Sequence, residues 1–139
     1  MRILLAALAL VALAQPARAE NLRAMVDMAA LTAGVPEDIA HAVIQIESGY
    51  KPYLRGAAGE WGLGQIKCQT ARGVGFRGAC HALADPATNL RFSFAYLRLA
   101  LDRGGAGCAG VSLYQRGVYG RPSCSRYGRQ VMARVRTRA

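Results

Sequence analysis

One glutamate of this chain occupies a position suited to a general acid. Glu47 closes a segment with helical spacing, and Val43 and Ile44 precede it by four and three residues. Residues at this spacing share a helix face, so the Glu47 carboxyl is expected on an apolar face. Partial desolvation raises the pKa of a carboxyl, and a general acid that works near neutral pH needs this shift. The same pattern also fits an ordinary solvent-facing glutamate at a helix end.

The elements that would position Glu47 are mainly helices. Apolar residues at helical spacing, with glycines and an Asp85-Pro86 pair at the ends, predict helices over 22–33, 36–49, 65–72, 85–104, 111–115 and 127–135. Between them, the glycine-rich segment 54–64 predicts a loop with a short extended element. No β-hairpin signal is strong. The fold class predicted is therefore mainly α.

The N-terminus has the three parts of a secretory signal peptide. Arg2 gives a positive start, an apolar run extends from Ile3 to Ala14, and Ala17 and Ala19 are small residues where a signal peptidase cuts. The run is shorter than the roughly 20 residues that span a bilayer, and no cysteine that could carry a lipid follows it. We therefore expect no stable membrane anchor. We predict a signal peptide over 1–19, one mature domain over 20–139, and export to the periplasm or cell wall.

Four cysteines lie in the mature part, and an even number in an exported chain suggests disulfides. Three pairings are possible, and we favour the local pairs Cys68–Cys80 and Cys108–Cys124. Each would contribute roughly 3 kcal/mol. The alternative is a metal site of Cys68, Cys80 and His81, but the spacing fits no zinc pattern. We therefore expect neither a metal nor a cofactor.

The chain is strongly basic, with a formal net charge of +10. Seven arginines lie between Arg116 and Arg138, with no acidic residue among them. Such a surface attracts polyanions. For an exported chain the anionic cell wall or a membrane surface is a better partner than nucleic acid, for which no recognition motif is present. A basic face that only keeps the protein soluble is the alternative.

A series of short motifs runs along the chain in order. They are Glu47-Ser48-Gly49, Gly62-Leu63-Gly64-Gln65-Ile66, Thr70-Ala71-Arg72, Asp85-Pro86-Ala87-Thr88-Asn89-Leu90, Ala95-Tyr96-Leu97 and Leu113-Tyr114-Gln115-Arg116-Gly117. Together they resemble the lytic transglycosylase (SLT) domain of the goose-type lysozyme superfamily, over nearly all of 20–139. The resemblance implies a single lysozyme-like domain with a cleft beside the glycine-rich segment.

The resemblance also implies an activity. The family cleaves the β-1,4 bond between MurNAc and GlcNAc in peptidoglycan and leaves 1,6-anhydro-MurNAc ends, with Glu47 here as general acid and then base. Glycosidases usually need two carboxylates, and besides Glu47 only Glu60, the single acid of the glycine-rich segment, lies beside the expected cleft. One carboxylate suffices when the C6 hydroxyl of the muramic acid is the nucleophile. The scarcity of a second acid therefore favours ring closure.

Substrate-binding residues follow from the same resemblance. They are Ser48, Gln65, Tyr96, Tyr114 and Gln115, where Ser48 could instead be a polar helix-end residue and Tyr96 and Tyr114 core aromatics. Glu60 is added because it lies beside the expected cleft, and a solvated or loop-stabilising carboxylate is the alternative. Two positions depart from the family pattern, because Gly64 replaces a methionine that lines the cleft and Gln115 replaces an asparagine. We expect these departures to affect the fit of the substrate more than the chemistry.

Two other functions remain open on the sequence. A lysozyme-like muramidase would hydrolyse the same bond with Glu47 and either Glu60 or a bound water, and a non-catalytic basic module would only bind the wall. The partner expected is the peptidoglycan glycan strand, met by a monomer. A secretion or flagellar apparatus is a further candidate partner, and general wall turnover is the alternative to it.

Overall fold

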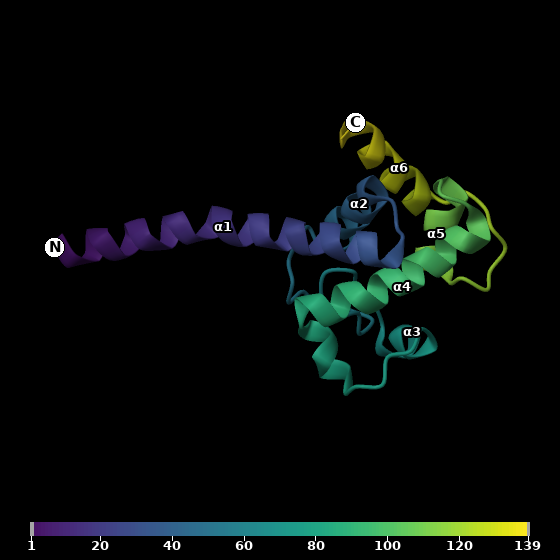
Figure 1. The fold of residues 1–139 in the computed structure, drawn as a ribbon, viewed down its shortest axis with the longest axis horizontal. Coiled ribbons are helices and arrows are strands. Elements are labelled where there is room, and N and C mark those ends of the chain that lie inside the picture. Colours follow the sequence, from purple (N-terminus) through teal and green to yellow (C-terminus); the bar gives the residue numbers. More distant parts are fainter. Residues whose placement is uncertain (1, 139) are drawn as a thin grey trace.

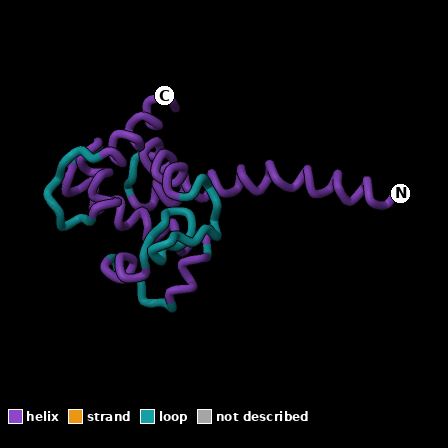
Figure 2. The backbone as a smooth tube through the Cα atoms, turned by 180° about the vertical axis from the view of Figure 1, so that it is seen from behind, coloured by secondary structure: helices purple, strands orange, loops and turns teal. Residues whose placement is uncertain are grey.

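The computed structural model describes the backbone from Arg2 to Arg138 and the side chains of residues 18–137. Within this part of the chain the elements are helices and connecting loops, with no strand (Figures 1 and 2). They are α1 (Arg2–Ala33), α2 (Glu37–Glu47), α3 (Cys68–Gly73), the 3-10 helix η1 (Cys80–Ala84), α4 (Pro86–Gly104), α5 (Cys108–Arg116) and α6 (Arg126–Arg138). The prediction of a mainly α single domain is confirmed.

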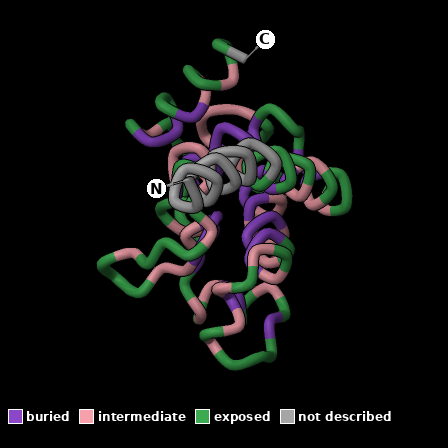
Figure 3. Tube along the Cα trace, turned by 90° about the vertical axis from the view of Figure 1, so that its left-hand side faces the viewer, coloured by how far each residue is buried: buried purple, intermediate pink, exposed green. Residues whose placement is uncertain are grey.

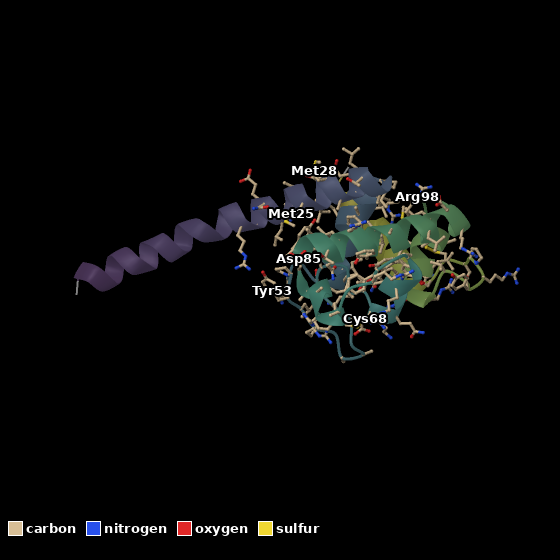
Figure 4. All side chains as sticks on the ribbon, turned by 60° about the horizontal axis from the view of Figure 1, so that its bottom comes forward. Met25, Met28, Tyr53, Cys68, Asp85 and Arg98 are labelled. Atoms are coloured by element: carbon tan, nitrogen blue, oxygen red, sulfur yellow. A yellow bond between two sulfur atoms is a disulfide. The ribbon has the colours of Figure 1, made fainter. Side chains whose placement is uncertain are left out.

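The predicted starts and ends of the helices are largely confirmed. Gly34, which follows α1, has a φ of 67° that favours glycine and stops the helix. Asp85 is the N-cap of α4, where its side chain accepts a hydrogen bond from the Thr88 backbone N–H at 2.8 Å (Figure 4). At the end of α4, Gly105 has a φ of 83°. These ends are set by local chemistry, which a sequence shows directly.

Three predicted helix starts are wrong. The helix expected from residue 22 begins at Arg2, and the helix expected from residue 111 begins at Cys108. The sequence predicts a helix from residue 65, but α3 begins at Cys68. Trp61 and Ile66 form an isolated antiparallel bridge, and Gln65 has a φ of 47°, which no helix residue adopts. A second bridge joins Arg55 to Trp61. The extended element expected in the glycine-rich segment therefore continues further along the chain than predicted.

The buried side chains form two clusters of unequal size. The larger one is built from α1, α2, α4, α5 and α6, and Phe94 on α4 is its largest fully buried side chain. The smaller one contains Ile66, Phe76 and Leu83, under α3 and η1. Tyr96 on α4 packs against both clusters. Figure 3 shows buried positions concentrated along α4. In Figure 1 this helix crosses the molecule, with α1 and α2 above it and α3 below it.

Both cysteine pairs that the sequence favoured are disulfides. Cys68–Cys80 ties α3 to η1, and Cys108–Cys124 ties the start of α5 to the loop before α6. The alternative metal site of Cys68, Cys80 and His81 is thereby removed. Disulfides of this kind constrain the unfolded chain, which suits a small domain with little interior.

The N-terminal part of α1 projects away from the other helices (Figure 1). It contains the apolar run of the predicted signal peptide, whose side chains lie outside the described residues. The first residue of α1 in the larger buried cluster is Leu22. Among the described helices, none combines the length and hydropathy that a membrane span requires.

Candidate active site

A cleft of about 560 Å³ opens where α2 ends and the glycine-rich loop faces α5. Its lining consists of Glu47, Glu60, Gln65, Ile66, Lys67, Thr70, Tyr96, Tyr114, Gln115, Arg116 and Gly117. A larger groove of about 830 Å³ lies between α1 and α4, but its described lining is mainly apolar and contains no carboxylate. The cleft is therefore the candidate active site.

Glu47 is the last residue of α2, and its carboxyl is partly buried. Tyr127 on α6 donates a hydrogen bond from its hydroxyl to Oε1 of Glu47 at 2.6 Å. Burial raises the pKa of Glu47 to about 7, the Tyr127 hydrogen bond opposes this rise, and the charge of Glu60 adds to it. Glu47 is therefore protonated in a large share of the molecules at neutral pH, as a general acid must be.

Two tyrosines flank the Glu47 carboxyl. Burial, followed by the charge of Glu47, raises the pKa of Tyr114 and of Tyr127 well above the usual range. Both hydroxyls therefore keep their protons and act as donors. Tyr127 donates to Glu47, whereas Tyr114 donates to the Gly64 carbonyl at 2.7 Å. One tyrosine thus positions the carboxyl, and the other positions the loop opposite to it.

Asn89, fully buried on α4, holds the glycine-rich loop in place. Its side-chain amide donates to the carbonyls of Trp61 and Leu83 at 2.7 and 2.8 Å, and its Oδ1 accepts from the Gly64 N–H at 2.8 Å. At Gly62, where φ is 62°, a Cβ atom would lie 2.7 Å from the Asn89 amide nitrogen. The glycine allows the loop to approach α4 closely enough for these bonds.

Gly64 is the position where the family usually has a methionine, and the structure gives it a packing role. A Cβ atom at Gly64 would lie 2.2 Å from Ser93 Oγ and 3.0 Å from the Tyr114 hydroxyl. Ser93 is itself fully buried. In this chain the space next to residue 64 is thus filled by Ser93, and any side chain at 64 would push the loop away from α4 and α5.

The structure brings most of the predicted site residues together. Besides Glu47, five of them line the cleft, and they are Glu60, Gln65, Tyr96, Tyr114 and Gln115. Gln65 is fixed by hydrogen bonds from its amide to the carbonyls of Leu54 and Gly62 at 3.1 and 2.8 Å. Glu60 accepts a hydrogen bond from the Ala58 N–H at 3.0 Å. Tyr96 accepts one from the Val118 N–H at 3.1 Å.

Ser48 is absent from this lining, and the sugar-binding role predicted for it stays a prediction. It follows α2 and is buried, and its hydroxyl donates to the Ile44 carbonyl at 3.2 Å. Its side chain is therefore part of the helix end that carries Glu47. A polar residue in this place satisfies the last carbonyls of a helix, and nothing in its contacts directs it to the cleft.

Sequence reasoning missed two residues that organise the site. Tyr127 falls in the helix predicted over 127–135 and Asn89 in one of the family motifs, and the sequence predicts a site role for neither. The contact of Tyr127 with Glu47 spans 80 residues, so helical periodicity cannot reveal it. For Asn89, the sequence offers only a weak signal, which is a polar pair with Ser93 at a spacing of four beside the apolar stripe that begins at Leu90.

The raised pKa of Glu47 predicts how stability depends on pH. The folded protein binds this proton more tightly than the unfolded chain, so the stabilisation is complete below about pH 4 and disappears as pH rises through 7. The free energy of unfolding of Glu47→Gln, relative to that of the wild type, should therefore increase by on the order of 3 kcal/mol between about pH 4 and about pH 8.5. Denaturant unfolding measures this difference.

Glu37→Gln is the matched control, because it removes an exposed carboxyl from the same helix. Between acid and alkaline pH, the free energy of unfolding relative to the wild type should increase more for Glu47→Gln than for Glu37→Gln. A difference that does not change with pH would show that the Glu47 carboxyl is not desolvated in the folded protein.

A mainly helical domain with a cleft between a larger and a smaller buried cluster has a lysozyme-like fold. The crystal structure of the 70 kDa soluble lytic transglycosylase SLT70 from Escherichia coli is similar, with a TM-score of 0.57 and 23% identity. The similarity covers 75% of this chain and 17% of that one. No curated protein sequence matches the chain. Residues 24–118 match the family described as Transglycosylase SLT domain, and the chain belongs to this family.

Proposed function

We propose that this protein is a peptidoglycan lytic transglycosylase that cleaves the β-1,4 bond between MurNAc and GlcNAc and leaves 1,6-anhydro-MurNAc ends. The observation that carries the proposal is the Glu47 carboxyl, partly buried in the cleft, with a pKa of about 7. Membership of the family supports the class of reaction. The bond cleaved and the role of Glu47 are our inference from the site.

In the first step, protonated Glu47 donates its proton to the glycosidic oxygen as the bond from that oxygen to C1 of the muramic acid breaks. The Tyr127 hydroxyl donates a hydrogen bond to Oε1 of Glu47, so the acidic proton is carried by Oε2. The substrate N-acetyl group stabilises the charge that develops at C1. Burial keeps this carboxyl protonated until the glycosidic oxygen receives the proton.

In the second step, the C6 hydroxyl of the same muramic acid attacks C1, and the Glu47 carboxylate takes the hydroxyl proton. The ring closes, the enzyme returns to its protonated form, and no water enters the products. Because nucleophile and electrophile belong to one sugar, the reaction gains from effective concentration if the cleft holds the ring in the required shape. Gln65, Tyr96, Tyr114 and Gln115, which line the cleft, are the residues that we propose for this task.

Hydrolysis is the second candidate function, and Glu60 is the observation that favours it. Glu60 lies in the same cleft, and its charge raises the pKa of Glu47. A muramidase could use this second carboxylate to activate a water or to stabilise charge at C1. Glu60 accepts a backbone hydrogen bond from Ala58, so it also has a role in shaping the loop.

Replacing Glu60 separates the two functions. If Glu47 acts alone, Glu60→Gln should retain cleavage of purified peptidoglycan to within about tenfold at about pH 5, because loss of a catalytic carboxylate costs roughly 100-fold or more. The loss of activity at alkaline pH should begin at a lower pH in this variant, since removing the Glu60 charge lowers the pKa of Glu47. Release of soluble fragments measures the rate. A loss as deep as that of Glu47→Gln would favour the two-carboxylate hydrolase.

We also propose that the protein is exported and acts on the wall as a monomer. The signal peptide prediction over 1–19 supports export, and the buried cluster begins only at Leu22, so cleavage after Ala19 removes no described core contact. Among the described residues of α6, the exposed arginines are Arg126, Arg129, Arg134 and Arg136. This basic face suits the anionic wall. A secretion or flagellar apparatus stays a candidate partner, beside general wall turnover.

A further inference from the structure

The cleft contains two cations for which the proposed chemistry has no use. Lys67 and Arg116 both belong to its lining. Lys67 directly precedes α3, and Arg116 is the last residue of α5, so the two cations reach the cleft from different elements. Neither has a carboxylate partner, because the ion pairs of the described residues are His41–Asp27 and Arg98–Asp102.

The two side chains differ in how they are held. The Lys67 side chain is exposed and makes no hydrogen bond within the described part of the chain. Arg116 is fixed, because its guanidinium donates to the Ser123 hydroxyl at 3.0 Å and to the Ser123 carbonyl at 2.7 Å. A guanidinium has five N–H donors, so these bonds leave others for a ligand. One cation is thus pre-positioned, and the other is adaptable.

The charges of the cleft favour an anionic ligand. When Glu47 is protonated, the remaining charges of the lining are Glu60, Lys67 and Arg116, which leaves a net positive charge. Glu60 is held by the Ala58 N–H on the glycine-rich loop, whereas both cations lie outside that loop. The sugar rings of the glycan are neutral. The part of the substrate that carries negative charge is the lactyl arm of the muramic acid.

We propose that Lys67 and Arg116 bind a carboxylate carried on the lactyl arm of the muramic acid, and so select muramic acid over a neutral sugar at the cleft. The inference rests on the proposed function, since it concerns the same site and substrate. The carboxylate has two possible sources. In intact strands the arm carries a peptide with acidic groups, and in strands without peptide the lactyl group itself ends in a carboxylate. Charge-assisted hydrogen bonds of this kind are stronger than those between neutral groups.

Binding measured in the Glu47→Gln background tests this proposal without cleavage of the ligand. The probes are soluble glycan strands with their peptides, the same strands after an amidase has removed the peptides, and chitohexaose, which is neutral. Lys67→Gln combined with Arg116→Gln should weaken binding of charged strands by about tenfold and leave chitohexaose unchanged. Loss on the first probe alone assigns the peptide carboxylates, and loss on the second assigns the lactyl carboxylate.

Controls separate charge from structure. Lys67→Gln alone removes no hydrogen bond within the described protein, so its loss of affinity reports the charge. Arg91→Gln removes an exposed cation of α4 that belongs neither to the cleft nor to the basic face of α6, and it should have no effect on any probe.

Equal loss of affinity for chitohexaose, or unchanged affinity for both charged strands, would overturn the inference. Cleavage by the protein with Glu47 intact is measured separately. Failure of that cleavage would refute the proposed function, and the binding comparison would still be decided on its own result.

Discussion

Glu47→Gln is expected to lower the rate of peptidoglycan cleavage by at least about a thousandfold, while binding of glycan strands is retained. Glutamine has the size of glutamate, and its amide oxygen still accepts the Tyr127 hydrogen bond seen at Oε1. The variant has no acidic proton for the leaving oxygen and no carboxylate to take up the C6 hydroxyl proton. Release of soluble fragments from purified peptidoglycan measures the rate, and co-sedimentation with the same material measures binding.

Glu37→Gln again provides the control for this experiment, since it changes an exposed carboxyl on the same helix and should cleave like the wild type. The result also separates an enzyme from a binding module. If wild type and Glu47→Gln bind the wall equally and neither cleaves it, the protein is a non-catalytic wall-binding domain. If the variant still cleaves at a rate near that of the wild type, Glu47 is not the acid.

Removal of the Cys108–Cys124 disulfide is expected to cost both stability and activity. Replacing both cysteines by serine should lower the free energy of unfolding by roughly 3 kcal/mol, because the bond closes a loop with a sequence separation of 16. Activity should fall further, by roughly tenfold to a hundredfold per folded molecule, since Tyr127 follows Cys124 by three residues and must reach Glu47 across the domain.

The Cys68–Cys80 disulfide is the matched control, with a sequence separation of 12. Its removal should cost a similar free energy of unfolding, but less activity per folded molecule, because it ties α3 to η1 and not the segment before α6. Denaturant unfolding gives the stability, and cleavage rates at a temperature where both variants are folded give the activity. Equal activity losses in the two variants would contradict a role of Cys108–Cys124 in placing Tyr127.

The helices could be predicted because their signals are local. Asp85 caps α4 and Gly34 ends α1 through contacts with residues a few positions away, so their types alone are informative. The start of α3 could not be predicted in the same way. It depends on the bridge between Trp61 and Ile66 and on the positive φ of Gln65, which are consequences of how the loop packs.

For the site as well, the residue with a local signal could be predicted, and the residues that act through packing could not. Glu47 was a candidate from its spacing to Val43 and Ile44, but only the order of the motifs made it more than an ordinary helix-end glutamate. The residues that fix its environment are distant in sequence. Tyr127 reaches it over 80 residues, and Asn89 binds the loop at Gly64 over 25. Such contacts arise from the packing of whole elements, which helical periodicity does not encode.

The ends left on the cut strands test the central claim most directly. In this experiment, purified mature protein digests peptidoglycan in water labelled with heavy oxygen. Mass spectrometry then identifies the muramic acid ends of the products. Ring closure through Glu47 predicts 1,6-anhydro-MurNAc ends that contain no oxygen from the solvent. Reducing MurNAc ends that carry labelled oxygen would contradict it, since a water would then have taken the place of the C6 hydroxyl.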